Sequence, residues 1–249
     1  MAEPRGSSAA AAAPKLHAAT PVPATPDPGA FLSILSHELR TPITTIYAGS
    51  RVLARHGATS PRASAEIAAD ISAEAAHLYD VVEDLLVLSR AGNGVLDLSD
   101  EPVHLQRLVE GAVRVAADRT PDTPIIVEEA TDPPAVRGDT GYVEQVVRNL
   151  LTAAIRRGPS AAPVTVRLAA RDGEVSVSVL DRGPDPTDDD LALAWELSDA
   201  TSGSGRTGNG IGLLVCRLLV DAMHGRVWIA RRAGGGAERG FELPRYATD

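Results

Sequence analysis

The chain has 249 residues, 44% of them hydrophobic and 23% charged, which is enough for one large globular domain or two smaller ones. Its formal net charge of -9 argues against a nucleic-acid-binding surface, because such a surface needs a basic patch to neutralise phosphates. No window reaches the ~20 apolar residues of a membrane-spanning helix and the N-terminus lacks a signal-peptide pattern, so we expect a cytoplasmic protein.

The first part of the chain predicts a tail followed by a helical hairpin. Residues 1–28 are rich in Ala, Pro, Ser and Thr, and they carry too little apolar variety to bury a core, which predicts disorder. Residues 29–95 hold two helical patterns separated by the Gly-, Pro- and Ser-containing stretch 56–64.

An apolar seam marks the second helix of this hairpin. Two helices with one apolar stripe each cannot enclose a core alone, so pairing with a second copy in a four-helix bundle predicts a homodimer. The alternative is a monomeric hairpin packed against the rest of the chain. The seam has two rows with seven-residue spacing: Ile71, Leu78 and Leu85 in one, and Ile67, Glu74, Val81 and Leu88 in the other.

Residues 100–246 predict a second domain in which helices and strands are interleaved. We expect a short strand leading into a helix over 100–119, a strand at 123–130, and a helix at 138–159 with Asp139 as its N-cap. A hairpin over 163–184, an irregular segment, a helix over 210–225 and two closing strands at 226–233 and 238–244 follow. This order favours an α+β fold in which a two-layer sandwich follows the helical hairpin.

Four short motifs stand on these elements. The first helix carries SHELRTP at 36–42, although proline is costly inside a helix because it removes a backbone hydrogen bond. The other motifs are QVVRNLLTAAIRRGP at 145–159, VSVLDRGP at 177–184 and GNGIGLLV at 208–215. In this order and spacing they resemble the phosphoacceptor box, the N box and the two glycine boxes of two-component sensor histidine kinases.

The resemblance implies a dimerisation and histidine phosphotransfer domain at 29–95 and a histidine-kinase-like ATP-binding domain at 100–246. In the first domain it implies that His37 accepts a phosphoryl group and that Glu38 accepts the other ring N–H. Thr41 would position water for dephosphorylation of the partner. Pro42 would let the helix bend beside His37 as the enzyme changes state.

In the second domain the resemblance implies that ATP lies between the N box and the glycine boxes. Asp181 would accept a hydrogen bond from the adenine amino group, and Gly183 would leave room beneath the base. Asn149 matches the first asparagine of the N box, and Arg156 would contact phosphate or ribose. The amides that open the last helix would meet phosphate oxygens beside Gly208, Gly210 and Gly212.

Three features depart from the family pattern. Ala153 stands where the second asparagine of the N box holds the Mg²⁺ that accompanies ATP, so the metal ligands stay unknown. Trp195 is the nearest equivalent of the phenylalanine in the family's lid. The run DPTDDD at 185–190 places carboxylates near the expected triphosphate, where they form a solvated acidic surface, repel the nucleotide or replace the lost metal ligand.

The resemblance therefore implies a histidine kinase that uses ATP and Mg²⁺ to phosphorylate His37 and passes the phosphoryl group to a cognate response regulator. Its activity is expected to be weak because Ala153 removes a metal ligand. The alternative is a degenerate kinase that acts as phosphoacceptor, as response-regulator phosphatase or as heterodimer partner of an intact kinase. A third option, an ATPase of the chaperone and gyrase-like superfamily, leaves the SHELRTP helix without a role.

Overall fold

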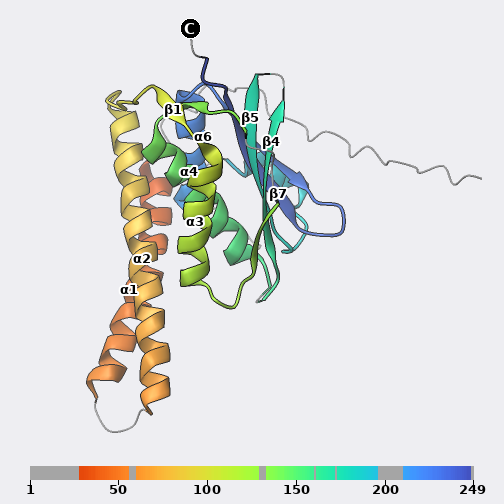
Figure 1. Ribbon diagram of the computed structural model, residues 1–249. Coiled ribbons are helices and arrows are strands. Elements are labelled where there is room, and N and C mark those ends of the chain that lie inside the picture. Colours follow the sequence, from red (N-terminus) through yellow and green to blue (C-terminus); the bar gives the residue numbers. More distant parts are fainter. Residues whose placement is uncertain are drawn as a thin grey trace, which may run out of the picture.

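The computed structural model describes residues 28–55, 60–128, 133–159, 161–171, 173–195 and 210–247. Of the predicted disordered tail, residues 1–27 lie outside the described residues, and Pro28 begins the first helix. In the described part, a long helical hairpin stands beside a domain of helices and strands (Figure 1). The predicted fold class, a helical hairpin followed by an α/β sandwich, is confirmed.

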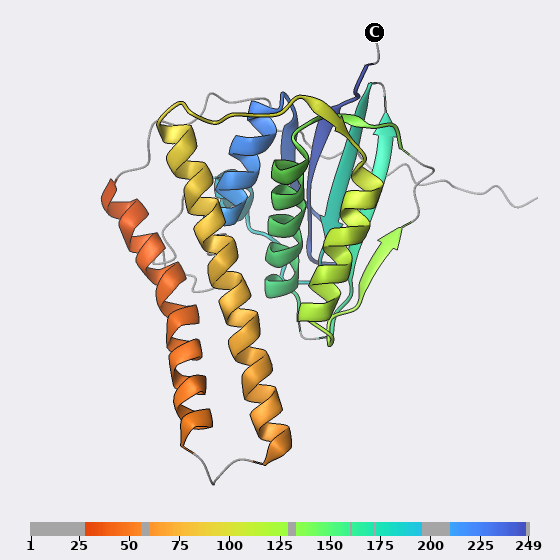
Figure 2. The ribbon, with the colours of Figure 1, turned by 60° about the vertical axis from the view of Figure 1, so that its left-hand side comes forward.

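The hairpin consists of α1 (Pro28–Ala54) and α2 (Pro61–Gly92). α1 continues through Pro42, whose side chain is buried. The hydroxyl of Ser60 caps α2 by accepting from the Ala63 amide, and the proline that follows sits in the first turn, where no helical hydrogen bond is lost. The far end of the hairpin projects away from the second domain (Figure 2).

The hairpin carries exposed apolar side chains besides those of the predicted seam. The seam faces α1 of the same chain, since Ile67 and Ile71 pack against Gly49. The predicted four-helix bundle would therefore pair through the other apolar side chains, which stay exposed within one chain. These are Leu32, Ile43, Tyr47 and Val52 on α1, and Tyr79, Val82 and Leu86 on α2.

The second domain packs a five-stranded sheet, in the order β2-β4-β5-β7-β6, against a layer of helices. This helix layer lies between the sheet and the hairpin (Figure 2). The core is formed by the apolar faces of the helices and the inward positions of the strands, and it reaches Ile34 and Val87 of the hairpin. The strands are β2 (Ile125–Glu128), β4 (Val164–Arg171), β5 (Glu174–Leu180), β6 (Arg226–Arg231) and β7 (Ala237–Pro244), and the helices are α3 (Leu105–Arg119), α4 (Thr140–Arg157) and α6 (Gly210–Ala222).

The predicted N-cap of α4 is confirmed. Asp139 caps α4, with its Oδ1 accepting from the Tyr142 amide at 3.1 Å. Trp195, which lies in the chain between β5 and α6, is buried in the hydrophobic core. None of the helices in the described ranges is long and apolar enough to cross a membrane.

Three features of the second domain were not predicted. β1 (Glu101–Val103) pairs antiparallel with an unexpected strand, β3 (Val136–Gly138). β2 pairs in parallel with β4, a contact between distant segments that local alternation does not reveal. The segment expected to be irregular opens with a short helix, α5 (Asp188–Leu193), because Thr187 and Asp190 form a reciprocal capping box.

Candidate functional site

His37 lies on an exposed part of α1, with 66% of its side chain accessible. Its Nδ1 is 3.9 Å from Oε1 of Glu38. This separation is longer than a hydrogen bond, so the carboxylate does not fix the tautomer of the ring. An exposed imidazole beside a carboxylate has the chemistry of a nucleophile that accepts a phosphoryl group.

A cleft of about 380 Å³ joins His37 to the second domain. Its α1 wall carries His37, Glu38 and Thr41, and the hydroxyl of Thr41 donates to the His37 carbonyl at 3.5 Å. The opposite walls come from α3 and α4. They carry three arginines, Arg119, Arg148 and Arg156.

Arg156 forms a hydrogen bond with the hairpin at this cleft. Its Nη1 lies 2.9 Å from Nε2 of His77 on α2. Because a guanidinium only donates, this ring nitrogen accepts. Burial, and then the charge of Arg156, lowers the pKa of His77, which keeps the nitrogen unprotonated. His77 thus belongs to the same cleft as His37, although its neighbours in the sequence gave no signal of a role.

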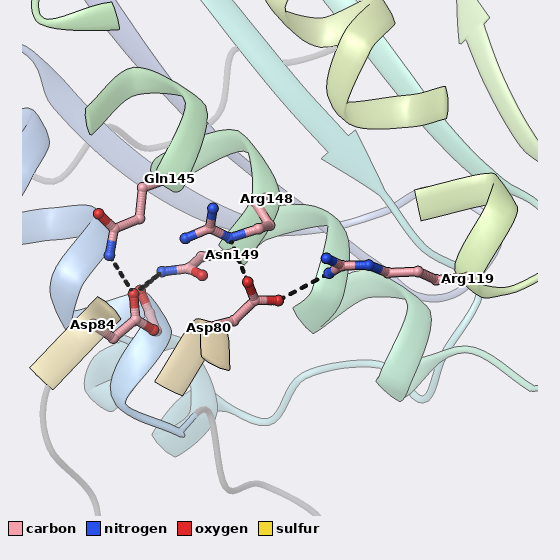
Figure 3. A network of polar contacts seen from close by, with 7 residues as sticks. Asp80, Asp84, Arg119, Gln145, Arg148 and Asn149 are labelled. Carbon is pink, nitrogen blue, oxygen red and sulfur yellow. Dashed lines mark hydrogen bonds and ion pairs between the residues drawn. The ribbon is translucent and has the colours of Figure 1, made fainter. Parts of the chain in front are cut away.

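Two carboxylates of α2 hold the second domain against the hairpin (Figure 3). Asp80 and Asp84 are one turn apart and share a face of the helix. Asp80 forms ion pairs with Arg119 of α3 and Arg148 of α4, each at 3.1 Å. A single carboxylate of the hairpin therefore ties down two helices of the other domain.

Asp84 engages the asparagine that was predicted to serve the nucleotide. Its Oδ1 accepts from Nε2 of Gln145 at 2.7 Å and from Nδ2 of Asn149 at 2.8 Å (Figure 3). The same Nδ2 also donates to the carbonyl of Gly212 at 3.2 Å. Asp84 is only 4% exposed, and this burial raises its pKa to about 6 even though the two amides lower it.

The second glycine box opens α6 beside this carboxylate. Gly208 lies outside the described residues, Gly210 begins α6 and Gly212 is in its first turn. A Cβ on Gly212 would stand 3.3 Å from both Oδ2 of Asp84 and Cγ of Asn149. The missing side chain thus lets α2, α4 and α6 meet.

Asp181 and Gly183 lie together just after β5. The Gly183 amide donates to Oδ1 of Asp181 at 2.8 Å. A Cβ on Gly183 would lie 2.6 Å from the carbonyl oxygen of Arg157, so only glycine fits beneath the end of α4. The other oxygen of Asp181 accepts from Arg239 of β7. Arg239 was not predicted as a site residue, although strand alternation puts it on the inward face of β7.

The carboxylates of 185–190 serve separate local contacts. Asp185 accepts from the Gly236 amide, Asp188 pairs with Arg231, and Asp190 bonds Thr187. Across the described residues, no three His, Cys, Asp or Glu side chains gather closely enough to hold a metal ion. Ala153, at the position of the second asparagine, packs against the core, and its methyl side chain offers no ligand to Mg²⁺.

Known families cover most of the described chain. Residues 29–94 match the His Kinase A (phospho-acceptor) domain, and residues 138–247 match the histidine kinase-, DNA gyrase B- and HSP90-like ATPase family. The signal transduction histidine-protein kinase BaeS of Escherichia coli is 30% identical over 86% of this chain and 46% of its own length. The probable sensor histidine kinase TcrY of Mycobacterium tuberculosis is 32% identical over 82% and 43%. The "Non-motile and phage-resistance protein" of Caulobacter vibrioides is 31% identical over 88% and 27%.

Solved structures agree with these matches. Full-length ShkA in complex with AMPPNP is 27% identical with a TM-score of 0.60, over 88% of this chain and 46% of that one. ThkA in complex with the response regulator TrrA shares the fold, with a TM-score of 0.61 at 20% identity over 88% and 62%. The fold and the two domains in this order define the catalytic core of a histidine kinase. The chain belongs to the two-component sensor histidine kinases, and it spans less than half the length of the three curated relatives named above.

Replacing Asp84 with Asn should remove a pH dependence of folding. A pKa raised from 3.8 to about 6 means that the folded chain binds the proton of Asp84 more tightly than the unfolded chain does. The stability that this proton contributes is therefore fully present below pH 3.8 and is lost as the pH rises through about 6. At ~1.36 kcal/mol per pKa unit, the buried charge on Asp84 lowers the free energy of unfolding by about 3 kcal/mol at neutral pH. Asparagine keeps an acceptor for Gln145 and Asn149 without the charge.

We therefore expect Asp84→Asn to raise the melting temperature at about pH 8 and to raise it clearly less at about pH 4.5. Asp70→Asn, at an exposed position of α2, is the control and should have no such effect. A melting-temperature difference between Asp84→Asn and the unmodified chain that is the same at both pH values would contradict the assignment.

Proposed function

We propose that this chain is the catalytic core of a cytoplasmic histidine kinase that phosphorylates its own His37 with ATP. The surroundings of His37 carry the proposal, because this exposed imidazole lies beside Glu38 in a cleft shared with α4 of the ATPase-type domain. Transfer to a ring nitrogen needs an accessible nucleophile next to the nucleotide-binding domain, and both conditions are met at this cleft.

In the proposed reaction a ring nitrogen of His37 attacks the γ-phosphorus of ATP. A P–N bond forms while the bond between the γ-phosphorus and the oxygen of the departing ADP breaks. Glu38 stabilises the positive charge that develops on the ring, and its position beside Nδ1 favours Nε2 as the attacking atom. Arg148 and Arg156 line the cleft and offset the charge of the transferred group.

The nucleotide is proposed to bind through Asn149, Asp181, Gly183 and the glycines at 208, 210 and 212. Both polar members of this set have protein partners here, Asp84 and Arg239. ATP binding therefore requires an exchange of hydrogen bonds, which lowers its net gain in free energy. Mg²⁺ would be held mainly by the phosphates of ATP, because Ala153 offers no ligand.

We propose a response regulator and a second copy of this chain as partners. An aspartate of the regulator would take the phosphoryl group from His37, and Thr41 would orient water when the regulator is dephosphorylated. The exposed apolar residues of α1 and α2 support the homodimer, because a surface of this kind is stable when another copy covers it.

His37→Gln should abolish labelling by γ-labelled ATP, because glutamine offers no ring nitrogen to the phosphorus. The label should be acid-labile in the unmodified chain, as a P–N bond is. His104→Gln, at the exposed start of α3, should label normally and serves as control. Acid-labile phosphate that persists in His37→Gln would refute the choice of histidine.

Ala153→Asn should increase ATP affinity and His37 labelling, because it restores an amide oxygen to the N box. One recovered contact worth ~1.4 kcal/mol corresponds to about tenfold. Ala154→Ser, at the neighbouring buried position of α4, controls for adding any polar atom to the helix. Strong labelling of the unmodified chain that Ala153→Asn leaves unchanged would show that the lost asparagine does not limit activity.

Val82→Glu combined with Leu86→Glu should convert the dimer into a monomer. Each buried aliphatic side chain contributes about 2 kcal/mol, and in a symmetric dimer each change acts twice. Val115→Glu, an exposed valine of α3, is the matched control and should stay dimeric. Light scattering at micromolar concentration measures the state, and a monomer in the unmodified chain would rule out the proposed pairing.

A further inference from the structure

β7 carries a fully buried arginine. Four inward positions of this strand, Ala237, Arg239, Phe241 and Leu243, are each at most 1% exposed. Arg239 is the charged member of this row, and it is the largest side chain buried to this degree among the described residues. A guanidinium in such a place needs a partner of opposite charge, because desolvation of an unpaired ion is costly.

The partner of Arg239 is the carboxylate predicted to recognise adenine. Asp181 is itself 1% exposed, and its Oδ2 accepts from Nη1 of Arg239. Its Oδ1 accepts from the amides of Gly183 at 2.8 Å and Ala237 at 3.2 Å. A carboxylate has about four acceptor positions, so three are engaged and burial closes the fourth to a ligand.

Arg239 is not fully satisfied in this position. Its Nε is buried without a hydrogen-bond partner among the described residues, which makes the pair less favourable than a fully bonded one. Burial, and then the charge of Arg239, lowers the pKa of the neighbouring Arg157. The carboxylates of Asp190 and Asp181 act in the opposite direction and raise the pKa of Arg157.

We propose that Arg239 sets the nucleotide affinity of this site by occupying Asp181, so that ATP binds only after the guanidinium has left the carboxylate. The adenine amino group and Nη1 of Arg239 are alternative donors to the same oxygen, and they therefore compete. The proposal rests on the proposed function, which takes Asp181 as the base-recognition residue. It makes Arg239 a determinant of affinity for the base and not for the triphosphate.

The test compares ATP with inorganic tripolyphosphate, which lacks the base. Dissociation constants are measured by calorimetry on the full chain and on Arg239→Val and Arg239→Met, of which the second keeps most of the side-chain volume. We expect ATP to bind at least about tenfold more tightly to both variants. Tripolyphosphate should not gain, because removal of a positive charge disfavours a polyanion.

Arg226→Val is the matched control. Arg226 also lies on a strand of the same sheet and pairs with carboxylates, those of Glu174 and Glu242, but it is half-exposed. Its removal should leave both dissociation constants unchanged. Thermal unfolding of each variant verifies that it is folded at the assay temperature.

Three results would overturn the proposal. ATP affinity that is equal in the unmodified chain and in both Arg239 variants would remove the role of Arg239 while leaving ATP binding intact. An equal gain for tripolyphosphate would mean that the effect does not involve the base. Absence of ATP binding in every folded variant would overturn the proposed nucleotide site together with the role of Arg239.

Discussion

A carboxylate inside a protein has to be matched by donors, and two such groups on α2 determine how the domains of this chain meet. Asp80 forms ion pairs with arginines of α3 and α4, and Asp84 accepts hydrogen bonds from two amide side chains of α4 beside the start of α6. Apolar contact through Ile34 and Val87 joins the cores but is non-directional. The hydrogen bonds fix the orientation, because their geometry tolerates little displacement.

This arrangement would couple the domain interface to the proposed nucleotide site. The amide of Asn149 serves Asp84 of the hairpin and the carbonyl of Gly212 on α6. A ligand that takes this amide leaves a buried carboxylate short of a donor, which costs free energy at the interface. If Asn149 binds nucleotide as proposed, binding of the nucleotide and docking of the hairpin would oppose each other through this one side chain.

The two ends of the proposed nucleotide site follow the same physical rule. Groups that bind a polar ligand are themselves polar, and in a closed interior they need partners when the ligand is absent. Asp84 satisfies Asn149 at one end, and Arg239 satisfies Asp181 at the other. His37 differs, since its ring is exposed to solvent and lies farther from Glu38 than a hydrogen bond would allow.

Local patterns in the sequence determined most of the elements and the chemistry of the phosphoacceptor stretch. Helical periodicity, the Asp139 cap and strand alternation each act over a few residues, so α1, α2, α4 and the closing strands could be predicted. The pairing of Asp84 with Asn149 joins residues 65 positions apart, and that of Asp181 with Arg239 joins residues 58 apart. The neighbouring sequence predicts neither pairing. In the sequence, Asp84 is one charged residue on a long helix, and Arg239 is one charged residue on a strand. Only the packing of α2 on α4 and of β7 beside β5 decided their partners, because burial removes the water that would otherwise satisfy them.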